Sequence, residues 1–190
     1  MQAVDPNNPP STPPQPDAEL VEAAFRELHG PSLHGFALLV TLGDRHRAAM
    51  LAADALDAAG DRLASLRHPE RAAAWLRWHA ARAAKRDDRR LASPDRMAAL
   101  RDLGITPAAL AGLAGLSQTE RAGLVAVAIE RLDRRDVATI VGRDGTRLDR
   151  FLRAARRRYL VGATASPGDL DSSPGPIRRR IAASAARTLA

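Results

Sequence analysis

The chain contains no cysteine and few aromatic residues, and both absences restrict what it can be. Without cysteine there are no disulfide bonds, no thiolate metal sites and no cysteine nucleophile. Aromatic residues make up only 3% of the sequence, whereas 45% of its residues are hydrophobic. A core must therefore be formed mainly by leucine, valine, isoleucine and alanine, which favours closely packed helices. The composition predicts an all-α fold.

Lysine is almost absent as well, although the chain is strongly basic. Lys85 is the single lysine among 29 basic residues, and with 22 acidic residues the formal net charge is +7. A charge of this size favours polyanionic partners such as nucleic acid or an anionic membrane surface. Arginine binds phosphate in a bidentate manner, and the nucleotide composition of the source genome accounts equally well for its excess over lysine.

Long hydrophobic runs are also missing. No apolar run reaches the roughly 20 residues needed to cross a bilayer. The first residues are proline, asparagine and glutamine rather than a basic segment followed by an apolar one. We therefore expect no signal peptide, no membrane insertion and a cytoplasmic location.

The polar residues show no pattern typical of catalysis or of metal binding. The chain has no G-x-S-x-G motif, and its GRDG segment lacks the glycines and the lysine of a phosphate-binding loop. The chain has five histidines, His29, His34, His46, His68 and His79. None of them is four residues from another potential metal ligand in a pattern such as H-E-x-x-H. We expect no catalytic residue, no metal and no cofactor.

Apolar periodicity divides the N-terminal half into a tail and a helical domain. Residues 1–16 are rich in proline and predict a disordered tail, whereas residues 17–91 predict a first helical domain. Within the first helix, one apolar stripe is formed by Leu20, Val21, Ala24, Phe25 and Leu28. We expect four helices in this domain, over residues 17–30, 32–42, 44–63 and 69–90. Gly30-Pro31 would end the first, Asp44 would be the N-cap of the third, and Pro69 would occupy the first position of the fourth.

The C-terminal half predicts a linker, a second helical domain and a terminal helix. In residues 92–115, Ser93-Pro94 and Thr106-Pro107 each resemble a helix start, which predicts two short helices or a partly ordered linker. Ser117 and Glu120 have the spacing of a capping box, so a helix to about Glu130 opens the second domain, residues 116–161. Residues 162–175 predict a flexible linker, and residues 176–190 an amphipathic helix with apolar residues every four positions.

Within the second domain, residues 134–141 and 146–159 predict two helices joined by a tight turn. Val137 and Val141 supply inward contacts, and Ala138 is small enough for the second helix to approach. Gly142 can adopt a positive φ at the turn without a Cβ penalty. The pattern predicts a helix-turn-helix motif.

The second of these helices has two distinct faces. Its expected buried face consists of Leu148, Phe151, Leu152, Ala155 and Tyr159. Arginines recur every three or four positions on another face, namely Arg147, Arg150, Arg153 and Arg157. Arginine on a helix exterior is often only a solvated face, but next to a helix-turn-helix it favours contact with phosphates and guanine edges in a major groove.

Two segments resemble the extracytoplasmic-function sigma factors, the small promoter-recognition subunits of bacterial RNA polymerase. Residues 116–160, LSQTERAGLVAVAIERLDRRDVATIVGRDGTRLDRFLRAARRRYL, resemble the C-terminal domain of that family. Upstream, LHGFALLVTLGDRHRAAMLAADALDA and LRHPERAAAWLRWHAARAA are similar to its polymerase-binding and promoter-melting domain, with Trp75-Leu76 at the W-L signature. The resemblance covers about residues 18–160. It implies two helical domains that bind promoter duplex DNA, the RNA polymerase core and an anti-sigma protein.

The resemblance and the arginine pattern together define the expected DNA contacts. In the second domain these are Arg143, Thr146, Arg147, Asp149, Arg150, Arg153, Arg156, Arg157 and Arg158. We expect Arg147, Asp149, Arg150 and Arg153 to contact bases, and Arg143, Arg156, Arg157 and Arg158 to hold phosphates. In the first domain, opening of a duplex requires ring surfaces and basic side chains, and the candidates for promoter contact are Trp75, Trp78, Arg82, Lys85 and Arg86. Tryptophan on an alanine-rich helix is more often part of a core.

A second interpretation keeps the sigma fold but not the initiation activity. Met50, Ala53, Asp54 and Leu56 stand where the family usually has an acidic residue, then glutamine and an acidic residue, then phenylalanine. These departures favour a protein-interaction module or regulator that binds a polymerase subunit or an anti-sigma partner without initiating transcription.

Overall fold

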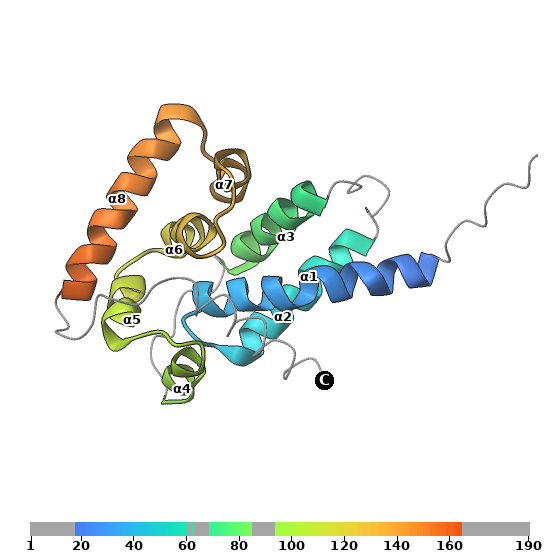
Figure 1. Cartoon of the computed structure of the whole chain (residues 1–190), viewed down its shortest axis with the longest axis horizontal. Coiled ribbons are helices and arrows are strands. Elements are labelled where there is room, and N and C mark those ends of the chain that lie inside the picture. The colour runs from blue at the N-terminus through green and yellow to red at the C-terminus, as the bar shows by residue number, and fades with distance from the viewer. Residues whose placement is uncertain (1–17, 61, 63–68, 85–93, 165–190) are drawn as a thin grey trace, which may run out of the picture.

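The computed structural model describes residues 18–60, 62, 69–84 and 94–164, and all regular structure within these ranges is helical. The all-α prediction is confirmed. Along the chain the elements are α1 (Ala18–Val40), α2 (Arg45–Gly60), α3 (Pro69–Ala84), α4 (Pro94–Asp102), α5 (Pro107–Ala114), α6 (Gln118–Leu124), the π-helical turn η2 (Val125–Ile129), α7 (Arg134–Val141) and α8 (Gly145–Thr164). Helices α1–α3 lie on one side of the molecule and α8 on the other (Figure 1). The expected tail 1–16 and C-terminal helix 176–190 lie outside the described residues.

The predicted helix break at Gly30-Pro31 is wrong, because α1 continues through Pro31 to Val40. Proline removes one backbone hydrogen bond, and the carbonyl that loses it belongs to Glu27 on the exposed side of the helix. The continuation is stabilised by burial, since Leu33, Phe36 and Leu39 are at most 1% exposed. Hydrophobic packing of this second half of α1 therefore outweighs the local effect of one proline.

The expected apolar stripe at the start of α1 is not buried among the described residues. Leu20 and Leu28 are 68% and 65% exposed, and Val21 is 40% exposed, whereas Phe25 is partly buried against the core. The first half of α1 extends beyond the helices that cover its second half (Figure 1). Periodicity alone thus identified the stripe but not whether a neighbour covers it.

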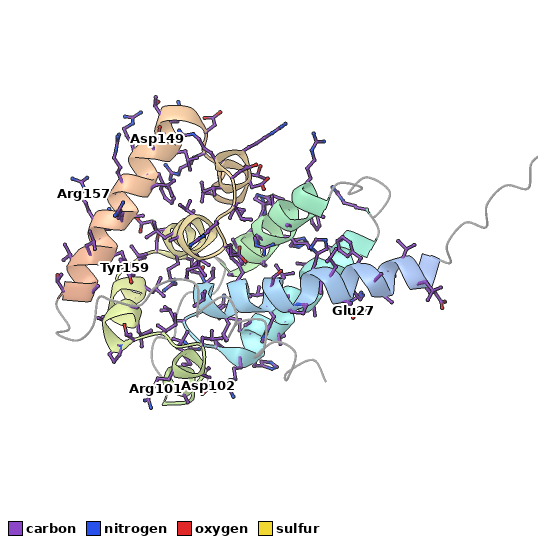
Figure 2. All side chains as sticks on the ribbon, viewed as in Figure 1. Glu27, Arg101, Asp102, Asp149, Arg157 and Tyr159 are labelled. Atoms are coloured by element: carbon purple, nitrogen blue, oxygen red, sulfur yellow. The ribbon has the colours of Figure 1, made fainter. Side chains whose placement is uncertain are left out.

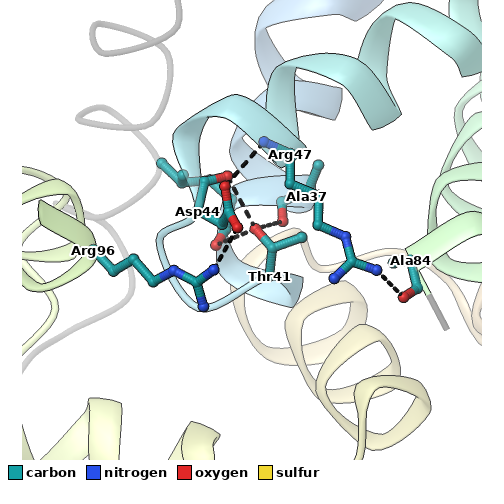
Figure 3. A network of polar contacts seen from close by, with 7 residues as sticks. Ala37, Thr41, Asp44, Arg47, Ala84 and Arg96 are labelled. Atoms are coloured by element: carbon teal, nitrogen blue, oxygen red, sulfur yellow. Dashed lines mark hydrogen bonds and ion pairs between the residues drawn. The ribbon is translucent and has the colours of Figure 1, made fainter. Parts of the chain in front are cut away.

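The turn between α1 and α2 is held by a polar network (Figure 3). Asp44 Oδ1 accepts a hydrogen bond from the Arg47 backbone N–H at 3.0 Å, which confirms the predicted N-cap of α2. The other carboxylate oxygen of Asp44 pairs with Arg96 of α4, and the Arg47 guanidinium donates to the Ala84 carbonyl at the end of α3. Helices α2, α3 and α4 are therefore held together at this turn. Helix α2 ends at Gly60, before the expected end at residue 63.

Most buried apolar side chains of the described residues form one large hydrophobic core, while Leu42, Leu113 and Leu116 form a smaller separate cluster. The large core contains Leu33 of α1, Leu76 of α3 and Leu100 of α4, and it extends to Val137 of α7 and Leu148 of α8. Helix α3 contacts α1, α2 and α7. The residues predicted to form two domains thus bury their apolar side chains against one another.

A buried ion pair crosses this core between Arg77 of α3 and Glu130, the residue after η2. Their side chains are only 5% and 11% exposed. The guanidinium contacts both carboxylate oxygens, with Nη2 2.6 Å from Oε1, and Nη1 donates to the Ala73 carbonyl at 3.0 Å. Nη2 also lies 3.3 Å from Ser32 Oγ of α1. One side chain therefore connects α1, α3 and the segment that leads to α7.

The helices of the C-terminal half begin where local signals predict. Thr106 Oγ1 accepts from the Ala109 N–H at 3.2 Å, and Ser117 and Glu120 form the reciprocal capping box. The expected helix to Glu130 is a shorter α6 followed by the π-helical turn, in which the Glu130 N–H donates to the Val125 carbonyl at 3.0 Å. Helix α8 ends at Thr164, so the predicted end of this helix near Tyr159 is too early. Tyr159 packs closely against Gly112 of α5, because a Cβ added to Gly112 would lie only 2.6 Å from the tyrosine ring.

We expect Gly43→Ala to destabilise the protein by about 1–3 kcal/mol. Gly43 has a φ of +84°, and a Cβ at this position would lie 2.4 Å from the Arg96 carbonyl oxygen. The control is Gly60→Ala, because a Cβ there meets only the Glu22 side chain at 3.6 Å. Urea unfolding followed by circular dichroism measures both variants, and equal midpoints would contradict the prediction.

Glu130→Gln should lower the free energy of unfolding by about 3–5 kcal/mol, because it leaves the buried Arg77 charge uncompensated. The matched control is Glu22→Gln, which alters an exposed pair with Arg26 (2.9 Å) and should cost less than about 1 kcal/mol. Chemical unfolding at neutral pH compares the two. If both substitutions cost the same small amount, the buried pair contributes no more than a surface pair.

Stability should decrease as the pH falls below about 6.5, the ordinary pKa of histidine. Burial lowers the pKa of His29 and of His34, with smaller contributions from the charges of Arg77 and Arg45 respectively. On these two side chains the folded chain binds fewer protons than the unfolded chain, so the free energy of unfolding decreases as the pH falls through this range. Urea midpoints between pH 8 and pH 5 test this, and His34→Gln should reduce the slope. An unchanged slope in the variant would exclude His34 as a source.

Candidate nucleic-acid interface

Helices α7 and α8 are joined by a turn with the geometry that the sequence predicts. Asp133 caps α7 by accepting from the Asp136 N–H at 2.8 Å. Gly142 ends the helix at a φ of +67°, which confirms its predicted left-handed conformation, and the Arg143 N–H donates to the Ala138 carbonyl at 3.1 Å. Both predicted inward residues of α7, Val137 and Val141, are buried.

The first turn of α8 is fastened to the start of α7 by Arg134. Its guanidinium pairs with the Asp149 carboxylate and also donates to the Gly145 carbonyl at 3.0 Å. The hydrogen bond from Arg134 is the main cause that lowers the pKa of Asp149, and the same bond raises the pKa of Arg134. The Asp149 carboxylate, expected to contact a base, is thus already paired within the protein.

The predicted faces of α8 are the ones that the structure shows. Leu148 and Ala155 are fully buried, while Phe151, Leu152 and Tyr159 are partly buried against neighbouring helices. Arg157 points away from the rest of the molecule (Figure 2). All the expected contacts except Asp149 are exposed, namely Arg143, Thr146, Arg147, Arg150, Arg153, Arg156, Arg157 and Arg158.

Two of these exposed arginines have partners within the protein. The Arg143 guanidinium lies 4.7 Å from the centre of the Phe151 ring. Arg158 pairs with Glu120, whose side chain is only 6% exposed. By contrast, Arg147, Arg150, Arg153, Arg156 and Arg157 form no ion pair with any carboxylate in the described part of the chain. The charge of Arg153 contributes to lowering the pKa of Asp149 but forms no ion pair with it. This set of five, the free arginines of α8, is available to an external anion.

The candidates of the first half lie on α3. Trp75 is partly buried against the core and Trp78 is partly buried beside it, with ring centres 6.3 Å apart, as their three-residue spacing predicts. Arg82 is exposed, and its guanidinium lies 5.6 Å from the centre of the Trp78 ring. Lys85 and Arg86 lie outside the described residues.

A cleft of about 900 Å³ separates α3 from the α7–α8 turn. It brings Trp78 and Arg82, from the first half, together with Arg143 and Arg147, from the second. The remaining lining residues are Ala81, Thr119, Arg135, Ala138, Thr139, Ile140, Val141, Gly142 and Asp144. The sequence patterns did not predict Arg135, Thr139 or Thr119 as site residues. Arg135 and Thr139 are four residues apart on the exposed side of α7, and this helical spacing is the one sequence signal for those two residues.

Comparison with known proteins adds no assignment, because no protein-family model, no curated protein and no solved structure matches the chain. Within the described residues, no helix combines the length and the apolar character required to span a membrane. The same residues contain no group of three or more histidine or acidic side chains placed to hold a metal ion.

Proposed function

We propose that the protein binds promoter DNA through α8 and directs RNA polymerase to promoters, as a sigma factor does. The observation that carries this proposal is the set of free arginines of α8, which occupies one exposed side of a helix whose other side is packed in the core. A protruding basic helix with this arrangement suits the major groove, where arginine contacts guanine and phosphate oxygens.

The α7–α8 unit would act as a helix-turn-helix. Its first helix and turn would position the recognition helix against the sugar-phosphate backbone, and Arg150 and Arg153 would read base edges. The Arg134–Asp149 pair supports this role by holding the first turn of α8 in place before DNA binds. Arg158 is partly occupied by Glu120, so we assign it a weaker contribution.

The resemblance of the first half of the chain to the polymerase-binding domain of sigma factors supports polymerase binding. One observation favours a second candidate function. Met50 is 52% exposed on α2 and Ala53 is exposed as well, at positions where the resemblance leads us to expect polar or acidic residues. An apolar surface there suits a protein partner. The second candidate is therefore a sigma-fold interaction module or regulator that lacks initiation activity.

Arg150→Ala and Arg153→Ala should each weaken binding to duplex promoter DNA by about tenfold or more, because each removes a charge-assisted contact. The matched control is Arg101→Ala, which removes an exposed arginine from α4, on a different part of the molecule (Figure 2). Binding is measured by fluorescence anisotropy over a range of salt concentrations, since a phosphate contact also contributes to the salt dependence.

Run-off transcription with core RNA polymerase and a promoter library separates the two candidates. Transcripts that require the wild-type protein and decrease with both α8 variants support a working sigma factor. Duplex binding without any transcript supports the regulator. If neither duplex binding nor transcription depends on the α8 arginines, DNA recognition by this helix is excluded.

A further inference from the structure

The cleft between α3 and the α7–α8 turn has a composition that its neighbouring surfaces do not share. One wall is provided by Trp78, Ala81 and Arg82 of α3. The opposite wall is formed by the exposed side of α7 and by the turn that leads into α8. Because the walls come from distant parts of the sequence, the cleft exists only in the folded chain.

Positive charge dominates this cleft. Four arginines line it, Arg82, Arg135, Arg143 and Arg147, against the single carboxylate of Asp144. Among the described residues, none of the four forms an ion pair with a carboxylate. Guanidinium groups that converge on a concave surface favour phosphate, which they bind through paired hydrogen bonds. The hydroxyl group of Thr119 adds a donor on the same surface, whereas the Thr139 hydroxyl already donates to the Arg135 carbonyl at 3.1 Å.

An aromatic ring lies beside these charges. Trp78 is partly exposed, and the guanidinium of Arg82 is 5.6 Å from its ring centre, so a stacking surface and a phosphate-binding group are adjacent. Ala138, which is partly exposed, supplies apolar surface across the cleft. Bases stack on such rings regardless of their identity, whereas inorganic phosphate gains nothing from them. The combination therefore selects a molecule with both a base and a phosphate.

The cleft shares Arg147 with the free arginines of α8 but differs in shape from the duplex-reading face of that helix. The cleft has a volume of about 900 Å³ and is open to solvent, so a small ligand can enter it. Major-groove recognition, in contrast, uses a protruding helix. We propose that this cleft is a binding site for a nucleotide, with the base against Trp78 and the phosphates between Arg82, Arg135 and Arg147. Two sources supply this chemistry, a free nucleoside phosphate and an unpaired nucleotide of single-stranded DNA.

Calorimetric titration of the full chain with ATP, adenosine and pyrophosphate tests the proposal. We expect ATP to bind more tightly than either fragment, because only ATP uses both the ring and the arginines. Arg135→Gln should weaken ATP binding about tenfold by removing a charge-assisted contact. Arg101→Gln, on α4 and outside the cleft, should leave it unchanged. Trp78→Leu should reduce the preference for ATP over pyrophosphate while retaining pyrophosphate binding.

Competition then separates the two sources and keeps this inference distinct from DNA reading by α8. An oligodeoxythymidine that displaces ATP, with the same dependence on Arg135, supports a strand of DNA as the occupant; failure to compete supports a free nucleotide. Arg150→Ala should lose duplex affinity and retain ATP affinity. The proposal is overturned if ATP does not bind, if pyrophosphate binds as tightly as ATP, or if Arg101→Gln weakens ATP binding as much as Arg135→Gln.

Discussion

The arrangement of the helices depends on one buried charge, the guanidinium of Arg77. A charged group in a hydrophobic core is tolerated only when its hydrogen bonds are satisfied and its charge is balanced. Glu130 supplies the balance, and the Ala73 carbonyl and Ser32 hydroxyl supply further contacts. The pair joins α3 to the segment between η2 and α7, so it sets where α7 lies against α3. Phe36 of α1 lies beneath the same guanidinium, with its ring centre 5.8 Å away.

The position of α7 determines the chemistry of the surface. Because α7 packs on α3, Arg135 of α7 and Arg147 of α8 face Trp78 and Arg82 across a cleft, together with Arg143 of the turn. The remaining arginines of α8 project to the outside on a helix that the core supports from behind. Two basic surfaces thus result from one packing arrangement, a convex face to which we assign duplex DNA and a concave one to which we assign a nucleotide.

Much of the local structure could be predicted from the sequence. Asp44, Thr106 and Ser117 begin their helices as side-chain caps, Gly142 ends α7, and Leu148 and Ala155 are buried where the helical period places them. These features depend on residues within a few positions of each other. The errors have a different origin: α1 passes through Pro31 because its second half is buried, and the stripe of Leu20 and Leu28 stays exposed because no described helix covers it.

By itself, the sequence determined the helical class, the caps, the α7–α8 turn and the two faces of α8, since short-range hydrogen bonds and periodicity decide them. Only the tertiary structure decided which charges are used internally and which remain available. Arg134 reaches Asp149 over 15 residues, Arg158 reaches Glu120 over 38, and Arg77 reaches Glu130 over 53. No periodicity encodes contacts at these separations. They form because burial of the core brings the helices together, and the cleft arises between α3 and α7 for the same reason.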